Sequence, residues 1–377
     1  MSQWIAGFRS AVISPYEEIK LAESLSFTDQ TVRQILRLAG GGGRIRLALT
    51  NRYGTAPLSV GAAGIALRKT GSAQASDTAR PVLVGGAAEF LIAAGESVVT
   101  DPIDLPVATG DDLLLSLYLP GPTGLATFSH QPGEISYVTE GDAVDAPELP
   151  GAQEVPFRFY VTGVDVLDEA GTPVAVALGD SWFEGVGTTM SANRRSVDAL
   201  NARLSRGHVV NQGIAGNRLT RTEIGEAGVD RLHDDALSVP GATDVLINFG
   251  INDLILGAMA GQAPATSDDL VTAFTALAAR AHAAGLRVHA ATIGPYAGCV
   301  FPGMPIAETL PTRRSVNEWL RTTDLFDSVF DVARAVEDPA RPDYIRPDFD
   351  SGDGMHLNDA GAAAMAAAVD IDALFIE

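Results

Sequence analysis

Hydrophobic and polar positions alternate over short distances in the first part of the chain. Between residues 44 and 167, apolar runs of modest length are separated by glycine, proline and aspartate. The runs are RIRLALTNRYG, LSVGAAGIALR, RPVLVGG, ESVVTDPIDL, DDLLLSLYL, ISYVTEG and FRFYVTGVDVL. Short strands with turn residues between them are typical of an antiparallel sandwich. Segment 27–39 has both helical and β-branched spacing, and we expect a strand there.

The pattern changes after LDEAGTP at 167–173, where continuous apolar runs begin to alternate with amphipathic segments. Strands are expected at 174–178, 208–212, 244–249, 287–293 and 328–332, and helices near 192–205, 226–238, 267–284, 308–322 and from about 358. This alternation predicts an α/β domain in which a parallel sheet is covered on both faces. We therefore expect a β-sandwich domain over 1–168 and an α/β domain over 169–377. Ligands of such sheets bind at the carboxyl ends of the strands.

The composition is that of a globular protein with a large core, and the 377 residues suit two domains. No apolar run is long enough to span a bilayer. The opening MSQWIAGFRSAVISPYEEIK has Glu17 and Glu18 close behind a short apolar patch, unlike a signal peptide. The sequence predicts a cytoplasmic protein, or a secreted one if a leader has been removed.

The charge balance excludes some partners. With 47 acidic and 26 basic residues, the formal net charge is -21, so nucleic acids and anionic membranes would be repelled. Cys299 is the single cysteine, which excludes an internal disulfide and a cysteine-rich zinc site. The GGGG run at 40–43 lacks the Lys-Ser or Lys-Thr pair of a phosphate-binding loop, so it is a flexible turn.

A reactive hydroxyl stands at the end of the first α/β strand, in VALGDSWFEGVG at 176–187. Ser181 comes two residues after the apolar run, at the edge where chemistry is expected. A serine is a poor nucleophile until a base removes its proton, so a histidine and an orienting group are required. The alternative is that Ser181 only caps the next helix.

The other components follow later strands. NQGIAGN places Gly213 after the second strand, and GIND places Gly250 and Asn252 after the third. DGMHLND supplies Asp353 and His356, three residues apart, near the last helix. An acid, a base, a nucleophile and two donors thus come together from four separated segments.

GDSW, NQGIAGN, GIND and DGMH resemble, in order and spacing, the four blocks of the SGNH (GDSL-type) hydrolase superfamily. The β-rich front, with SFTDQTVRQILRLAGGGGRIRLALT, resembles the N-terminal region of a two-domain bacterial subgroup. The resemblance implies a flavodoxin-like three-layer domain preceded by a jelly-roll-like sandwich. It also implies that Ser181 is the nucleophile, His356 the base and Asp353 its orienting carboxylate. The implied oxyanion donors are the N–H groups of Ser181 and Gly213 and the side-chain amide of Asn252.

Four further residues are expected to contact substrate. Trp182 stands where the family often has an aliphatic residue, and could reshape the mouth of the pocket. Asn217 and Arg218 follow the oxyanion glycine, although Arg218 could instead form a surface ion pair. Tyr296 and Phe301, in the loop 294–312, could roof an acyl site or simply pack on one another. Loop 253–266 is expected to form the opposite wall.

No metal or other cofactor is expected. DFDSGDGMH lacks the Gly and Glu positions of a calcium loop, and the histidines show no HExxH spacing. The absence of GxSxG argues against the α/β-hydrolase nucleophile elbow.

The resemblance implies hydrolysis of short-acyl esters through an acyl-enzyme, with acetylated glycans or glycosides as the leading substrate class. An acyltransferase with the same triad and an inert carbohydrate-binding protein are the alternatives. The sandwich could buttress the catalytic domain or form a homo-oligomer interface.

Overall fold

The computed structural model describes residues 2–69 and 73–376, and it divides into two compact units. The first unit takes the chain up to Tyr16 and then Ala22–Thr172. The second takes Glu17–Leu21 and the chain from Pro173 onward. The chain therefore passes from the first unit to the second near the polar Gly-Pro break that the sequence pattern singles out. The short segment Glu17–Leu21 also goes with the second unit.

The first unit is built from antiparallel sheets. A four-stranded sheet has the order β1 (Gln3–Arg9), β14 (Val161–Asp168), β3 (Ile45–Thr50) and β8 (Ser97–Val99). A six-stranded sheet has the order β12 (Gln153–Val155), β11 (Ser136–Glu140), β2 (Gln30–Arg37), β9 (Asp112–Leu119), β5 (Ala62–Leu67) and β6 (Arg80–Pro81). Two small sheets pair β10 (Phe128–Ser129) with β13 (Arg158–Phe159), and β4 (Leu58–Val60) with β7 (Phe90–Ile92). The β-rich character of this region is confirmed, including the strand expected within 27–39.

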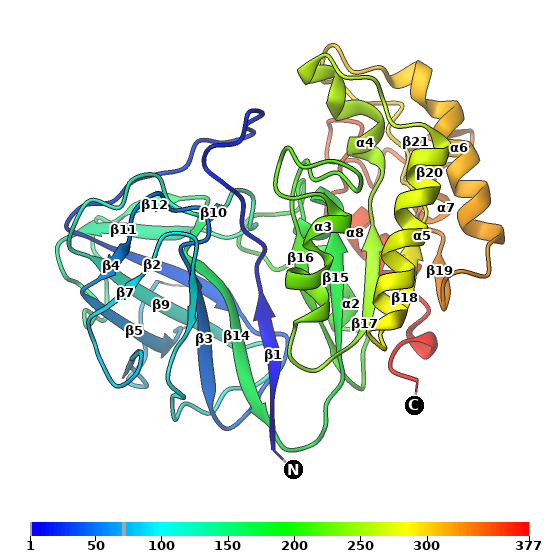
Figure 1. The fold of residues 1–377 in the computed structure, drawn as a ribbon. Helices are drawn as coiled ribbons and strands as arrows, with labels where there is room; N and C mark the ends of the chain where they lie inside the picture. Colours follow the sequence, from blue (N-terminus) through cyan, green and yellow to red (C-terminus); the bar gives the residue numbers. More distant parts are fainter. Residues whose placement is uncertain (1, 70–72, 377) are drawn as a thin grey trace. The chain divides into compact units, whose positions relative to one another are not determined.

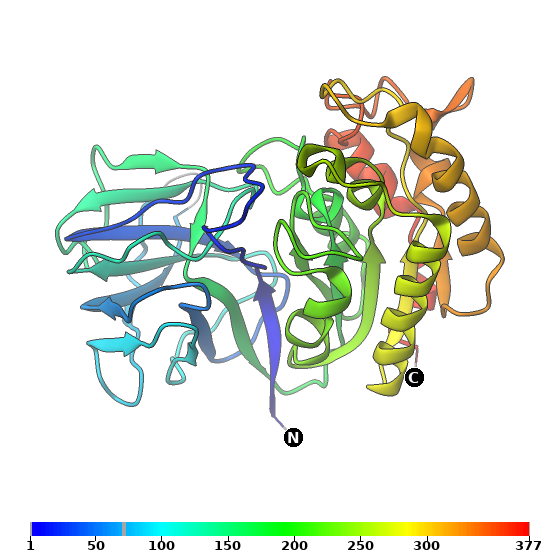
Figure 2. The ribbon, with the colours of Figure 1, turned by 45° about the horizontal axis from the view of Figure 1, so that its top comes forward.

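The second unit contains a five-stranded parallel sheet. Its strands are β15 (Val174–Gly179), β16 (His208–Gly213), β17 (Ala242–Asn248), β18 (Arg287–Ala291) and β19 (Ser328–Phe330). The order across the sheet is β16-β15-β17-β18-β19, which is the flavodoxin-like order 2-1-3-4-5. The predicted fold class of this region is confirmed. The arrowheads of β15 and β17 point to the top of Figure 1, and Figure 2 turns that edge toward the viewer.

Helices cover both faces of this sheet. They are α1 (Ser181–Glu184), α2 (Ser196–Asn201), α3 (Gly228–Leu232), the π-helix η1 (His233–Leu237), α4 (Ile251–Ile255), the 3-10 helix η2 (Leu256–Ala260), α5 (Ser267–Ala283), α6 (Ile306–Thr322), α7 (Val332–Val336), α8 (Asp359–Ala367) and the 3-10 helix η3 (Ile371–Ala373). The contacts fall into two sets, in which α2 and α7 pack on α8, and α3 and α6 pack on α5. Figure 1 shows α3 and α5 in front of the sheet and α2 and α8 behind it.

The predicted helices are present with changed lengths. The helix expected over 192–205 is only α2, whereas α5 and α6 agree with prediction within two residues. The hairpin β20 (Glu337–Asp338) with β21 (Arg341–Ile345) has no counterpart in the predicted elements.

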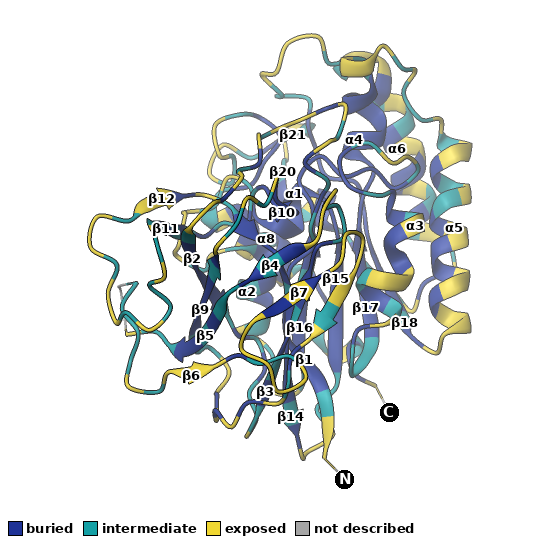
Figure 3. Cartoon of the chain, turned by 60° about the vertical axis from the view of Figure 1, so that its left-hand side comes forward, coloured by how far each residue is buried: buried dark blue, intermediate teal, exposed yellow. Residues whose placement is uncertain are grey.

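Burial explains why these segments form a sheet and its cover. Every residue of β15, VAVALG, is buried, as expected for a central strand covered on both faces. Helix α5 begins with a capping box, because Thr266 and Asp269 exchange hydrogen bonds at its first turn. Figure 3 shows α5 dark blue toward the sheet and yellow on its outer side. Within 2–69 and 73–376, no helix is long and apolar enough to cross a membrane.

Candidate active site

Ser181 lies on a sharp strand-to-helix corner. Strand β15 ends at Gly179, where a Cβ would lie 2.6 Å from the carbonyl oxygen of Asn248 and 2.7 Å from the Phe183 ring. Asp180 caps the next helix, because its Oδ1 accepts a hydrogen bond from the N–H of Trp182 at 3.1 Å. The corner presents the Ser181 hydroxyl at the carboxyl edge of the sheet, where only 3% of the residue is exposed.

Ser181, His356 and Asp353 are joined by hydrogen bonds in series. The distance from Ser181 Oγ to His356 Nε2 is 3.0 Å, and from His356 Nδ1 to Asp353 Oδ2 it is 2.6 Å. The geometry suits an imidazole that donates from Nδ1 to the carboxylate and accepts from the serine hydroxyl at Nε2. A proton can then move from the serine to the imidazole while the carboxylate holds the ring in place.

The environment keeps Asp353 ionised. Burial by itself would raise the pKa of this carboxyl. The hydrogen bond and charge of His356, with the N–H groups of Met355 and His356 on Oδ1, outweigh burial and hold the pKa well below its usual range. Asp350 supports the same turn, because its Oδ1 accepts from the N–H groups of Gly352 and Gly354. This aspartate therefore organises the loop that carries the acid and the base.

Trp182 is not at the mouth of a pocket, which corrects the sequence-based expectation. It is buried, and its ring fills the space that a Cβ on Gly294 would need. Its indole N–H donates to the carbonyl of Met355 at 2.9 Å. Trp182 thus joins the helix that carries Ser181 to the residue next to His356.

Gly213 is also corrected as an oxyanion donor. Its N–H already donates to Asn211 Oδ1 at 2.9 Å. A Cβ at this position would lie 2.2 Å from the backbone nitrogen of Glu184, so glycine is needed to let α1 approach β16. Its role is therefore in packing.

Gly216 has the properties that Gly213 lacks, and the sequence analysis did not identify it. It adopts a left-handed conformation with φ of 80°, in the turn closed by the bond from Asn217 N–H to Ile214 O. Among the described residues, no acceptor faces the N–H of Gly216 or the N–H of Ser181. Both donors remain available at the edge where β15 and β16 end.

Asn252 lies beside this turn. It is buried in α4, and its Nδ2 donates to the carbonyl oxygen of Asn217 at 3.0 Å. An amide nitrogen carries two hydrogens, so one remains for another acceptor. The predicted donor Asn252 is thus placed next to the residue that follows Gly216. Gly250, with φ of 119°, makes the preceding turn.

Asn217 has no polar group left for a substrate, which corrects its predicted role. It is fully buried, and its Nδ2 donates to the carbonyls of Ile224 and Glu226. Its Oδ1 accepts from Arg231 Nε at 2.9 Å. Asn217 therefore holds the shape of the loop after Gly216.

Arg231 was not identified from the sequence, although it connects several parts of the site. It is buried in α3, and its guanidinium donates to the carbonyl oxygens of Gly179 at 2.7 Å and Gln212 at 2.8 Å. One side chain thus joins the ends of β15 and β16 to Asn217. The available signal was an arginine within an amphipathic helical segment, where an exposed position is the usual expectation.

Tyr296 does not form part of a roof, which corrects a further expectation. Tyr296 is buried in the core, and its hydroxyl donates to Thr309 Oγ1 at 2.9 Å. Burial raises the pKa of this phenol to about 12. Phe301 is 45% exposed, and its neighbour Val300 donates its N–H to the carbonyl oxygen of Asp353 at 3.0 Å, so the contact of Phe301 with substrate stays a prediction. Cys299 is half-buried, 3.6 Å from the sulfur of Met355.

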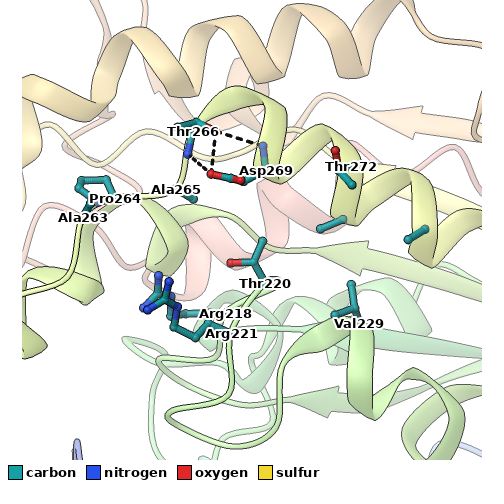
Figure 4. A pocket seen from close by; sticks show the side chains of 12 residues that line it. Arg218, Thr220, Arg221, Val229, Ala263, Pro264, Ala265, Thr266, Asp269 and Thr272 are labelled. Carbon is teal, nitrogen blue, oxygen red and sulfur yellow. Dashed lines mark hydrogen bonds between the residues drawn. The ribbon is translucent and has the colours of Figure 1, made fainter.

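Residues of the loop 253–266 face a cavity of 610 Å³, in which neither Ser181 nor His356 is a lining residue. Figure 4 shows its walls, which are formed by residues 263–266, the first turns of α5, and Arg218, Thr220, Arg221 and Val229. Arg218 is buried and pairs with Glu223 at 2.7 Å. Its pair is therefore an internal one. No cluster of three or more metal-ligating side chains occurs in the part of the chain that the structure describes.

A parallel sheet in this order, with a serine, a histidine and an aspartate hydrogen-bonded at its carboxyl edge, is the arrangement of an α/β serine hydrolase. The model of the GDSL-like Lipase/Acylhydrolase family matches residues 177–364, and the chain belongs to this family through that domain. It is accordingly a carboxylic ester hydrolase.

Several solved structures are similar to about half of this chain. A GDSL-like lipase from Bacteroides thetaiotaomicron is 18% identical, with 52% of this chain and 85% of that chain covered and a TM-score of 0.41. Est24, a carbohydrate acetylesterase from Sinorhizobium meliloti, is 18% identical, with 54% and 100% covered and a TM-score of 0.40. The aryl esterase of M. smegmatis is 16% identical, with 52% and 96% covered and a TM-score of 0.40. A comparison with curated proteins gave no match.

Proposed function

We propose that this protein is a serine esterase that hydrolyses short-acyl carboxylic esters through an acyl-enzyme intermediate. The observation that carries the proposal is the series of hydrogen bonds from Ser181 Oγ to His356 Nε2 and from His356 Nδ1 to Asp353. Each of the three groups has the neighbour that its role requires.

The reaction follows from these contacts. His356 Nε2 takes the proton of Ser181 as Oγ forms a bond to the ester carbonyl carbon. The bond to the leaving oxygen then breaks, and that oxygen receives the proton from His356. Water attacks the resulting acyl-serine, again giving its proton to His356, and the serine oxygen takes the proton back as the carboxylic acid leaves. Asp353 stays ionised and stabilises the imidazolium.

The negative charge on the carbonyl oxygen needs fixed donors. We assign them to the N–H groups of Ser181 and Gly216 and to the second amide hydrogen of Asn252. Donors of this kind act mainly in the transition state, and losing one typically costs about 3 kcal/mol of barrier. The assignment of Gly216 replaces Gly213, whose N–H is bound to Asn211.

Burial supports a small acyl group. Ser181 is 3% and His356 9% exposed, so only a small part of either residue is open to solvent. Acetyl esters of carbohydrates are the proposed natural substrates, with a glycan or glycoside as the alcohol part. The support for a sugar is the accessory β-rich unit, which resembles modules that accompany carbohydrate-active enzymes. Hydrolysis of acetylated xylan and of simple acetylated sugars, measured beside p-nitrophenyl acetate, tests this assignment.

A second series of serine, histidine and aspartate provides a matched control. Ser328 Oγ lies 2.7 Å from His289 Nδ1, and His289 Nε2 lies 2.9 Å from Asp244 Oδ1. The imidazole is fully buried, so an ester cannot reach it.

Ser181→Ala should leave a folded protein with essentially no turnover of p-nitrophenyl acetate, whereas Ser328→Ala should retain most of it. A fluorophosphonate probe should label Ser181 and not Ser328, as read by mass spectrometry of the peptides. Near-native turnover by Ser181→Ala, or labelling at Ser328 alone, contradicts the proposed function.

A further inference from the structure

A segment from the N-terminal part of the chain is built into the unit that carries the site. Glu17–Leu21 belongs to the second unit, apart from its neighbours in sequence. Glu17 Oε1 accepts a hydrogen bond from the N–H of Gly225 at 3.2 Å. The segment is thus attached to the loop that follows β16.

Leu21 lies directly against Gly216. A Cβ placed on Gly216 would be 3.0 Å from Leu21 Cδ1 and 2.7 Å from Ile224 Cδ1. Ile224 is buried, whereas Leu21 is 41% exposed, so part of this leucine remains open to solvent. Two apolar side chains therefore flank the glycine whose N–H we assign to the oxyanion.

These distances limit how far Leu21 can be from the reacting carbonyl. The Cβ–Cα and Cα–N bonds are each about 1.5 Å long. Added to the 3.0 Å between Leu21 Cδ1 and the Cβ position, they place Leu21 Cδ1 at most about 6 Å from the nitrogen of Gly216. A hydrogen bond adds about 2.9 Å to the carbonyl oxygen of a bound ester, which gives an upper limit of about 9 Å. An acyl chain of a few carbons spans that distance.

We propose that Leu21 is a specificity-determining residue that limits the length of the acyl group; the proposal rests on the proposed function. The leaving oxygen must face His356 Nε2 to receive its proton, and the carbonyl oxygen must face the donors at Gly216. The acyl chain is the remaining substituent of the carbonyl carbon, and the limit of about 9 Å places Leu21 Cδ1 within reach of a chain of a few carbons. Leu21, held by the Glu17 contact, closes the Gly216 side with an apolar wall.

The test compares two substitutions at Leu21 with the same substitutions at Leu91, which is 67% exposed on β7 of the first unit. The kcat/KM values of p-nitrophenyl acetate, butyrate, hexanoate and octanoate are measured for wild type, Leu21→Ala, Leu21→Trp, Leu91→Ala and Leu91→Trp. A second series keeps the acetyl group and varies the alcohol, from phenyl to naphthyl acetate. Circular dichroism establishes which variants are folded.

Leu21→Ala should raise the ratio of kcat/KM for hexanoate to kcat/KM for acetate by about 10-fold. One methylene group in an apolar pocket changes kcat/KM by at least about this factor. Leu21→Trp should lower the ratio, and the Leu91 variants should leave it unchanged. Ratios within about twofold of wild type in folded Leu21→Ala overturn the proposal, as does a change confined to the alcohol series. If Leu21→Trp does not fold, the ratio measured for Leu21→Ala alone tests the proposal.

The two proposals fail in different ways. A wild type that hydrolyses no ester, or a Ser181→Ala variant that remains active, overturns the proposed function and with it the role of Leu21. An active wild type that depends on Ser181 but has an unmoved acyl-length ratio overturns the role of Leu21 alone.

Discussion

At the scale of single residues, Asp180 is a carboxylate in an unfavourable place. It is buried beside Ser181, and its Oδ2 has no partner among the described residues. Burial raises its pKa to about 7, with Asp253 adding to the rise and Arg231 opposing it. The folded protein thus binds this proton more tightly than the unfolded chain, in which an aspartate titrates near 3.9.

The consequence is a pH-dependent loss of stability. The stability that the proton provides is complete below about pH 4 and is lost as the pH rises to 7. Asp180→Asn cannot ionise and keeps an acceptor for the N–H of Trp182. Its free energy of unfolding relative to wild type should therefore increase from pH 4 to pH 8, on the order of 2–4 kcal/mol at about 1.4 kcal/mol per pKa unit. Urea denaturation at several pH values measures this difference.

Asp372→Asn removes one negative charge at an exposed position and serves as the control for Asp180→Asn. The prediction is contradicted if the free energy of unfolding of Asp180→Asn relative to wild type does not change with pH, or falls as the pH rises.

Asn252 should matter for kcat. Asn252→Ala removes an amide hydrogen from the carbonyl oxygen, so kcat should fall by about 100- to 1,000-fold with a smaller change in KM. Asn252→Asp keeps the shape but replaces the donor with an acceptor, and it should be at least as impaired. Steady-state kinetics with p-nitrophenyl acetate test both. A rise in KM with unchanged kcat would instead assign Asn252 to substrate binding.

The same residues show how far the sequence could lead. Ser181, Asp353 and His356 could be found because their short motifs follow predicted strands and precede a predicted helix. The choice between Gly213 and Gly216 could not be made, because it depends on the Asn211 side chain, which occupies one N–H and leaves the other open. A glycine in a motif does not reveal whether its missing side chain is needed for close packing or its N–H is free to bind a ligand.

At the scale of secondary-structure elements, Arg231 fastens α3 to the ends of β15 and β16. Removing its guanidinium takes one donor each from the Gln212 carbonyl and the Asn217 side-chain oxygen. The Gly179 carbonyl then keeps only the N–H of Ile214. Arg231→Met should therefore lower the free energy of unfolding by about 3 kcal/mol or more.

Arg231→Lys keeps the charge but not the fork of donors, so its loss of stability should be intermediate. Urea denaturation at neutral pH gives the order of wild type, lysine and methionine variants. Equal stability of wild type and Arg231→Met would show that these hydrogen bonds contribute nothing net to folding.

Elements with a regular pattern were predicted, and elements defined by distant partners were not. The strands β15 to β18 each contain a short apolar run, and their ends were predicted to within two residues. Strand β1 was missed because its apolar residues do not alternate, and because it pairs with β14, about 160 residues away, with a bulge between Ala6 and Phe8. The hairpin β20–β21 consists mainly of polar and half-buried residues, so it lacks an apolar periodicity.

At the scale of the whole molecule, the net charge of -21 should act on substrate encounter. An anionic ester is repelled at low ionic strength, and salt screens that repulsion. The kcat/KM of an acetate ester with a carboxylate on its phenol should rise about 2- to 5-fold between 10 mM and 300 mM NaCl, as expected for charges within a Debye length or two. Neutral phenyl acetate is the control, and an equal response of both esters would exclude this explanation.

The assignment of Glu17–Leu21 to the second unit has a consequence for how such a protein can be recombined. The polypeptide changes units three times, after Tyr16, after Leu21 and after Thr172. If the chain from residue 173 onward were fused to a different N-terminal domain, the parallel sheet would be transferred, but the five residues Glu17–Leu21 of the same unit would be lost. A chimera made that way would be missing a piece from beside Gly216, so exchanging the accessory unit by one crossover also exchanges part of the enzyme.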